Sequence, residues 1–152
     1  MDEPWDGPNN RQLADEIYGV FSCPSYDSGN GETNNTNYCL VTGLGTLFES
    51  DRAPEFVDIK DGSSNTAILV EVNHGEIHWM EPRDLTLDEV LGIFEKVSGG
   101  DQNGNHPGIQ NVAHADGSTH SLSTSTEGND LLKLFLIADE SGKQNESDEI
   151  DD

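Results

Sequence analysis

Residue types that could do chemistry gather in one stretch of the chain, NHPGIQNVAHADGSTHSLS. It contains His106, His114 and His120, and the pair Asp116-Gly117 separates the last two histidines. Histidines that converge with a carboxylate can bind zinc, and a histidine beside a serine and an aspartate can activate the serine for hydrolysis. An Asp-Gly pair between alternating residues is also a strong signal for a β-hairpin. The chemistry of the stretch therefore depends on where its strands direct the histidines.

A hairpin with a two-residue type I′ turn at Asp116 would pair His114 with Thr119 and Ala113 with His120. Because side chains alternate along a strand, His114 and His120 would then point to opposite faces. Such histidines cannot easily share one ion, which argues against a zinc site. No serine lies in a nucleophile-elbow motif, so a serine hydrolase is not supported either. We therefore expect Asp116 to serve the turn.

His106 precedes Pro107 and lies outside the expected hairpin. A proline restricts the residue before it to extended backbone, which holds the histidine in a defined direction. We expect the imidazole to fix this loop through hydrogen bonds, with no metal required.

The residues just before His106 give a weak signal for calcium. Asp101, Asn103 and Asn105 repeat the Asp-x-Asn-x-Asn start of a calcium loop. The EF-hand pattern then fails, since His106 stands at the glycine position and Val112 at the position of the bidentate glutamate. The two interpretations left are a calcium ion on an irregular loop and a plain turn rich in asparagine and glycine.

Trp79, in the segment HWMEP, is the candidate for contact with a ligand. An exposed indole can stack on a sugar ring. The alternative, which is more common, is a half-buried aromatic residue in a strand.

The two cysteines, Cys23 and Cys39, are too few for a structural zinc site without help from histidine. A disulfide between them would stabilise the fold by about 3 kcal/mol in the chain-entropy model. Two unpaired thiols are the equal alternative, because the outcome depends on the redox compartment.

The strands that must position these residues are short. Apolar runs predict strands over 38–43, over 67–72 and over 77–82, with the last two joined as a hairpin. The hairpin around Asp116 adds a final pair. Strands that follow one another closely usually pair as antiparallel neighbours, so we predict an antiparallel sheet.

Three helices are predicted from apolar periodicity and capping residues. The first covers 11–18, with Asn10 as its expected cap. Thr86 and Glu89 fit the T-x-x-E capping box of the second helix. The third covers 130–138, with Asn129 as its expected cap.

The composition limits the partners. The chain has 152 residues with 30 acidic and 7 basic side chains, a formal net charge of −23. Such a charge repels phosphates, so nucleic acid and anionic membranes are poor partners. No apolar run reaches the roughly 18 residues that span a bilayer, and we expect a soluble polypeptide. We predict one domain over 1–138 and an acidic, flexible tail over 139–152.

Six pieces of the sequence occur in a characteristic order: DEPWDGPNN, VFSCPS, TNYCLVTG, DIKDGSSNTAILVEV, WMEPRDL, and a histidine followed after nine residues by Asp-Gly. The set resembles the bacterial prepilin-associated H-X9-DG family, over roughly residues 2–137. The resemblance assigns a structural signature to His106, Asp116, Gly117, Asp61, Gly62 and Asn65.

Together with the predicted elements, the resemblance implies an α+β fold, an antiparallel sheet with short peripheral helices. It would be a pilin- or pseudopilin-like head that lacks the N-terminal hydrophobic helix of the family. The head would lie outside the cytoplasm or at the cell surface, without membrane contact of its own, beside other pilin-like subunits or surface proteins.

The expected function is non-enzymatic and without cofactor, in surface assembly or secretion. A small-solute or sugar-binding module is the alternative, since the family is also catalogued under a solute-binding label. An extracytoplasmic setting would favour the disulfide between Cys23 and Cys39.

Overall fold

The computed structural model describes residues 3–16, 18–25, 34–49, 53–72, 77–98 and 105–138. The expected α+β class is confirmed, since these ranges contain a five-stranded sheet and two α-helices. None of the helices found there has the length and apolar character of a membrane span. The calcium candidates Asp101 and Asn103, and the acidic tail at 139–152, lie outside the described residues.

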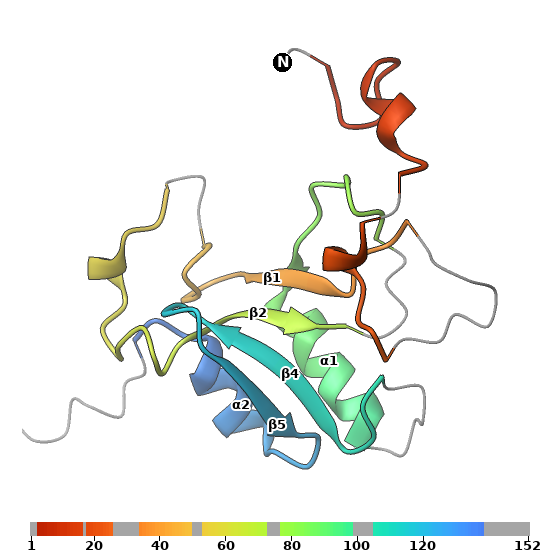
Figure 1. The fold of residues 1–152 in the computed structure, drawn as a ribbon. Helices are drawn as coiled ribbons and strands as arrows, with labels where there is room; N and C mark the ends of the chain where they lie inside the picture. Colours follow the sequence, from red (N-terminus) through yellow and green to blue (C-terminus); the bar gives the residue numbers. More distant parts are fainter. Residues whose placement is uncertain are drawn as a thin grey trace, which may run out of the picture.

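The strands follow the order β3, β1, β2, β4, β5 across the sheet (Figure 1). Their bounds are β1 Tyr38–Thr42, β2 Ala67–Glu71, β3 Leu85–Thr86, β4 Ile109–His114 and β5 Thr119–Ser123. β3 runs parallel to β1, and the other neighbours are antiparallel. The sheet is therefore mixed, which corrects the prediction of an antiparallel one.

The segment at 77–82, predicted to be the hairpin partner of β2, is not a strand. It forms an isolated bridge between His78 and Asn35. The chain then turns, and the Glu81 N–H donates to the His78 carbonyl at 2.8 Å. Pro82 follows, and a proline has no N–H to give to a strand ladder. The chain rejoins the sheet only at β3, beside β1.

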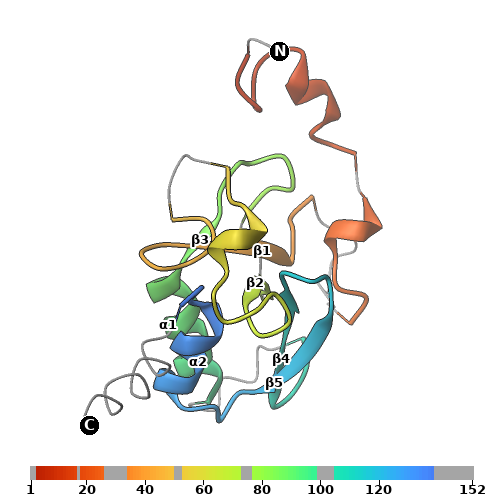
Figure 2. The same cartoon turned by 90° about the vertical axis from the view of Figure 1, so that its left-hand side faces the viewer.

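Both α-helices cover the same face of the sheet (Figures 1 and 2). α1 is Leu87–Ser98 and α2 is Gly128–Phe135. The side chains that meet between helices and sheet are almost fully buried: Val70, Val112, Val90, Phe94, Leu131 and Phe135. Burial of one such side chain stabilises the fold by about 1.5–3 kcal/mol, so this layer forms the core.

One of the three predicted helix caps is confirmed, that of Thr86. Asn10 is not a cap, because it is the first residue of a short 3-10 helix whose cap position is Asn9. The Thr86 N–H donates to Glu89 Oε2 at 2.8 Å, and the Glu89 N–H donates to Thr86 Oγ1 at 3.3 Å, which completes the capping box. The prediction that Asn129 caps the last helix is wrong. α2 begins earlier, at Gly128, and its cap position is Glu127, without a capping bond from the side chain.

Short 3-10 helices occupy the loops of the described chain: η1 Asn10–Leu13, η2 Gly19–Phe21 and η3 Phe56–Asp58. η1 stands where a longer helix was predicted over 11–18. It has no buried residue. Most of the stability of a short helix comes from packing of an apolar face, and here that packing is missing.

The β4–β5 hairpin is confirmed, but its turn is not the predicted one. The Gly117 N–H donates to the His114 carbonyl at 2.9 Å, and the His114 N–H donates to the Ser118 carbonyl at 2.8 Å. These bonds close a three-residue loop over 115–117 in place of a two-residue type I′ turn. Loops of this length commonly place a glycine in the left-handed region, and Gly117 has φ +86°.

The extra loop residue shifts the strand register by one. Val112 pairs with His120, where Ala113 was predicted. A shift of one residue moves every side chain to the other face. His114 and His120 therefore lie on the same face of the hairpin, and the prediction of opposite faces is wrong.

Replacement of Gly117 by valine is expected to destabilise the protein by about 1–3 kcal/mol, because a β-branched residue is strained at positive φ. A Cβ atom here would meet nothing within 4 Å, so the loss would report the backbone and not a clash. The measurement is denaturant unfolding. Gly92→Ala in α1 is the matched control, since it also adds a Cβ in open space and should be neutral or stabilising. A Gly117→Val curve that overlays the parent curve would contradict the turn.

Candidate functional site

Glu71 is a buried charged residue in an otherwise apolar strand. It ends β2, pairs with Tyr38 of β1, and is 2 % exposed. Its neighbours Val70 and Val72 belong to the core under the helices, so strand alternation directs Glu71 to the opposite face. The segment around η2 runs along the side of the sheet away from α1 and α2 (Figure 2). The carboxylate is therefore enclosed between the sheet and this segment.

Three side chains from distant segments meet at this carboxylate. Cys23 follows η2, Glu71 ends β2, and His106 precedes β4. The His106 Nε2 atom lies 3.4 Å from Cys23 Sγ and 3.4 Å from Glu71 Oε1. One atom of each side chain lies within 4.8 Å of the other two. We call Cys23, Glu71 and His106 the outer-face cluster.

Asn37 ties the cysteine segment to the sheet. Its Oδ1 accepts the Cys23 N–H at 2.9 Å, and its Nδ2 donates to the Val72 carbonyl at 3.0 Å. Its own N–H donates to the Phe21 carbonyl at 2.8 Å. Asn37 is 3 % exposed, so these bonds are protected from water. They hold Cys23 beside the end of β2.

Two asparagines hold the carboxylate of Glu71. Asn105 Nδ2 donates to Oε1 at 2.9 Å, and Asn111 Nδ2 donates to Oε2 at 2.7 Å. Burial opposes the charge most strongly, but bonds from Cys23, Asn105 and Asn111, with the charge of His106, hold the pKa of Glu71 below its usual range. Glu71 is thus a carboxylate at neutral pH.

Tyr38, which pairs with Glu71, also has a shifted pKa. Burial, then the charges of Glu71 and Cys23, raise the pKa of its hydroxyl. The tyrosine therefore stays neutral beside the carboxylate of Glu71.

The donor set of the outer-face cluster allows two kinds of chemistry. A sulfur, an imidazole nitrogen and a carboxylate oxygen are ligands that zinc takes in proteins. A cysteine nucleophile would need the thiol and the acid on different imidazole nitrogens. Here both lie beside Nε2, and Cys23 is 4 % exposed. The geometry fits a binding or structural cluster better than a nucleophile.

The other signature residues meet at the hairpin turn. Gly62 adopts φ +90° in the loop before β2, and Asn65 Nδ2 donates to the Asp61 carbonyl at 2.8 Å. The Asp116 N–H donates to the Ser63 carbonyl at 3.1 Å. The loop and the turn are therefore bonded to each other through their main chains.

Asp116 serves the turn, as predicted. It is exposed, and its Oδ1 accepts the Ser118 hydroxyl at 2.7 Å and the Ser118 N–H at 2.9 Å. These two bonds hold the pKa of Asp116 below its usual range. The carboxylate fixes the end of the hairpin.

His114 and His120 form a stacked pair on the shared face of the hairpin. Their ring centroids are 4.4 Å apart and the planes differ by 27°. His114 Nδ1 contacts the Ser64 carbonyl, while its buried Nε2 has no hydrogen-bond partner. Ring nitrogens bind in the plane of the ring, so two nearly parallel rings do not converge on one ion. The pair is no metal site, although the reason differs from the predicted one.

Trp79 is part of an aromatic group. Phe21 stacks on the indole at 5.6 Å, and Tyr18 meets it edge-on at 4.9 Å. Its Nε1 is buried without a hydrogen-bond partner. Trp79 is half-buried, which agrees with the alternative to ligand contact. It lies in a turn, however, and not in the predicted strand. A sugar would have to displace Phe21 to stack on that face.

The disulfide between Cys23 and Cys39 is not formed in this structure, and both cysteines are buried. Cys39 pairs with Val70 and belongs to the core on the helix side. Cys23 lies against Glu71 on the outer face. The sheet separates the two sulfurs. Burial raises the pKa of Cys39 to about 11, which makes it an inert thiol.

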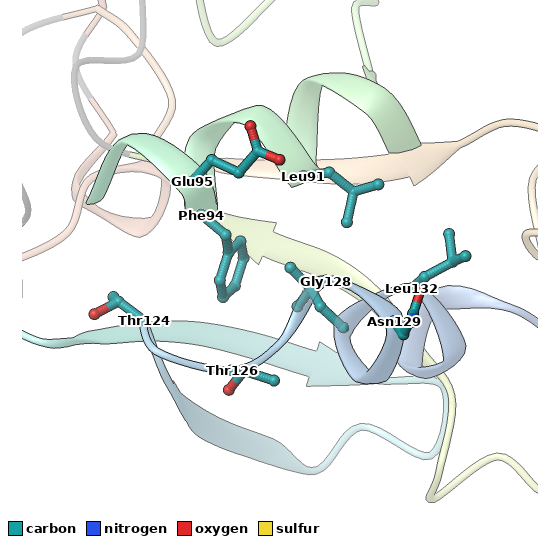
Figure 3. A pocket seen from close by; sticks show the side chains of 9 residues that line it. Leu91, Phe94, Glu95, Thr124, Thr126, Gly128, Asn129 and Leu132 are labelled. Carbon is teal, nitrogen blue, oxygen red and sulfur yellow. The ribbon is translucent and has the colours of Figure 1, made fainter. Parts of the chain in front are cut away.

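A cleft of about 290 Å³ lies between α1, α2 and the loop that joins β5 to α2 (Figure 3). Leu91 and Phe94 line it from α1, Leu132 from α2, and Thr124 and Thr126 from the loop. Its walls combine these apolar side chains and hydroxyl groups with the carboxylate of Glu95 and the side chain of Asn129. The cleft could hold a small solute but offers no cluster of reactive side chains.

Sequence reasoning named His106 and Cys23 but missed Glu71, Asn37 and Asn111. A signal for Glu71 was present, because an acidic residue inside an apolar strand must find partners when it is buried. The side-chain amide of Asn105, the third calcium candidate, donates a hydrogen bond to Glu71. No sequence feature indicated Asn111.

Comparison with known proteins leaves the family open. The chain matches no family model, no curated protein and no solved structure. The resemblance to the H-X9-DG family therefore depends on its motifs alone, and function has to be inferred from the site.

Glu71→Gln is expected to destabilise the protein by about 1.5–3 kcal/mol at neutral pH, since it replaces hydrogen bonds to a charged group. A carboxyl with a lowered folded pKa stabilises above its unfolded pKa, and this stabilisation is lost as pH falls through the folded pKa. The stability gap between parent and variant should therefore shrink below about pH 4.3, the unfolded value for glutamate.

The measurement is denaturant unfolding as a function of pH. Asp15→Asn, at an exposed position outside the cluster, is the control for loss of one acidic charge. The stability difference between the parent and Glu71→Gln could instead stay constant down to pH values at which all carboxyls are protonated. That result would show that Glu71 is not held as a carboxylate.

Proposed function

We propose that the chain is the non-enzymatic head domain of a pilin- or pseudopilin-like protein that acts in surface assembly or secretion. The observation that carries the proposal is the way in which residues within the six quoted pieces of sequence are used. Cys23, Asn37 and His106 bind around Glu71, and the loop before β2 binds the turn at Asp116. A reacting site keeps its side chains open to substrate, whereas these hold separate segments of the chain together.

Exposed apolar side chains supply contact sites for other subunits. Leu44 is 83 % exposed in the loop after β1, and Phe56 and Val57 are 72 % and 67 % exposed in η3. Contiguous exposed apolar side chains commonly mark contacts with other proteins, and Phe56 and Val57 are adjacent in η3. The net charge of −23 opposes non-specific association of the heads, so contact between subunits would depend on these apolar side chains.

The proposal places the head outside the cytoplasm. In cells that express the natural protein, protease added to intact cells should remove the head, and a cytoplasmic control protein should stay intact. Chemical cross-linking on intact cells should join the head to pilin-like subunits, identified by mass spectrometry. A head that stays protected in intact cells and fractionates with cytoplasmic proteins would contradict the proposal.

A small-solute module is the second candidate, and the cleft between α1 and α2 favours it. Its volume of about 290 Å³ is close to the lower end of small-molecule pockets, about 300 Å³. A solute held there should raise the melting temperature of the parent. Leu91→Trp, which fills the cleft, should abolish the shift, while Leu44→Trp, outside it, should not. A shift that persists in Leu91→Trp would exclude the cleft.

A further inference from the structure

We propose that Cys23, Glu71 and His106 bind a zinc ion on the outer face of the sheet. This proposal goes beyond the structural role assigned to the signature residues. It also reverses the expectation that His106 needs no metal.

The spacing of the three donor atoms fits an ion between them. In a tetrahedral zinc site, Zn–S is about 2.3 Å and Zn–N and Zn–O are about 2.0–2.2 Å, which puts neighbouring donors about 3.4–3.6 Å apart. His106 Nε2 lies 3.4 Å from Cys23 Sγ and 3.4 Å from Glu71 Oε1. The Cys23 sulfur and a Glu71 carboxylate oxygen lie within 4.8 Å of each other, so the three donors can close on a common ion.

Cys23 donates a hydrogen bond to Glu71, but the imidazole of His106 is shared between these two neighbours. Nε2 carries at most one proton, yet it faces a sulfur and a carboxylate oxygen at equal distance. The contact to Glu71 is also longer than a charge-assisted bond between nitrogen and oxygen, about 2.7–2.9 Å. An ion at the centre would replace the bond from Cys23 to Glu71 and the contacts of Nε2 by coordination to all three side chains.

The donor types select the metal. Calcium and magnesium take oxygen ligands, so a thiolate and an imidazole disfavour them. Zinc accepts sulfur, nitrogen and oxygen donors together. The thiolate of Cys23 and the carboxylate of Glu71 would balance its two positive charges, and buried charges need such compensation.

Neighbouring residues orient the proposed ligands, and one side of the site is accessible to water. Asn105 and Asn111 orient the carboxylate of Glu71 at 2.9 and 2.7 Å, and a carboxylate oxygen can accept a bond and coordinate a metal together. Asn37 holds the backbone of Cys23. The side chain of His106 is 27 % exposed, so water can reach the fourth coordination position from that side.

Zinc binding would join three segments and release a proton. The Cys23 thiol must lose its proton to coordinate, so the affinity should fall as pH is lowered. Because zinc binds the folded state, it should raise the melting temperature in a concentration-dependent way.

The test uses the purified chain, stripped of metal by a chelator and titrated with Zn²⁺ in a calorimeter. Titration in two buffers of different ionisation enthalpy counts the protons released. We expect one zinc per chain with release of a proton. Co²⁺ in place of zinc should give the near-ultraviolet charge-transfer band of a thiolate ligand.

Matched variants locate the ion. Cys23→Ser and His106→Gln should each lower the zinc affinity by at least tenfold, and Cys23→Ser should abolish the cobalt band. Cys39→Ser, which removes the core thiol, should leave the zinc affinity and the cobalt band unchanged. Asn111→Ala should weaken binding by about tenfold through the orientation of Glu71.

A readout in the parent protein covers the case in which a variant fails to fold. Zinc should slow alkylation of Cys23 at least tenfold, with Cys39 as the internal reference. Unchanged alkylation of Cys23, the absence of the cobalt band, or equal affinity in Cys23→Ser would each overturn the proposal. Equal affinity would mean that the ion binds only to the acidic surface.

Discussion

The carboxylate of Glu71 is the constraint on which the outer face of the sheet depends. A charged group that is 2 % exposed is tolerated only when its oxygens are bonded, because desolvation of an unpaired carboxylate costs several kcal/mol. Both oxygens of Glu71 accept amide donors, from Asn105 and Asn111, and His106 and Cys23 lie against the same group. Removal of one partner would leave a buried charge, so the cluster acts as a unit.

This requirement explains why distant segments meet. Cys23 brings the N-terminal segment to the sheet, and Asn37 fastens it through the main chain. Asn105 and His106 bring the loop before β4 to the same place. On the far side of the sheet the helices form an ordinary apolar core. The fold thus has an apolar layer on one face and a polar cluster on the other.

The sequence predicted the parts of this structure that depend on local patterns. β1, β2, the β4–β5 hairpin and the capping box of α1 follow from apolar runs, an Asp-Gly pair and a T-x-x-E motif. The hairpin register could not be derived, because two- and three-residue loops accept the same Asp-Gly pair. That difference of one residue decided on which face His120 lies.

The predictions that failed depend on tertiary contacts. The parallel pairing of β3 with β1 joins residues that no periodicity connects. The stacking of Phe21 on Trp79 and the separation of Cys23 from Cys39 by the sheet follow from packing and not from spacing. The meeting of Cys23, Glu71 and His106 has the same origin, although two of the three residues belong to recognised motifs.

A double-mutant cycle between Glu71 and His106 tests the central claim most directly. The free energy of unfolding would be measured at neutral pH, with chelator present, for the parent, Glu71→Gln, His106→Gln and the double variant. Residues of one cluster should show an interaction energy of about 0.5–3 kcal/mol. Effects that add to within about 0.3–0.5 kcal/mol would show that the two side chains act independently, and would contradict the account.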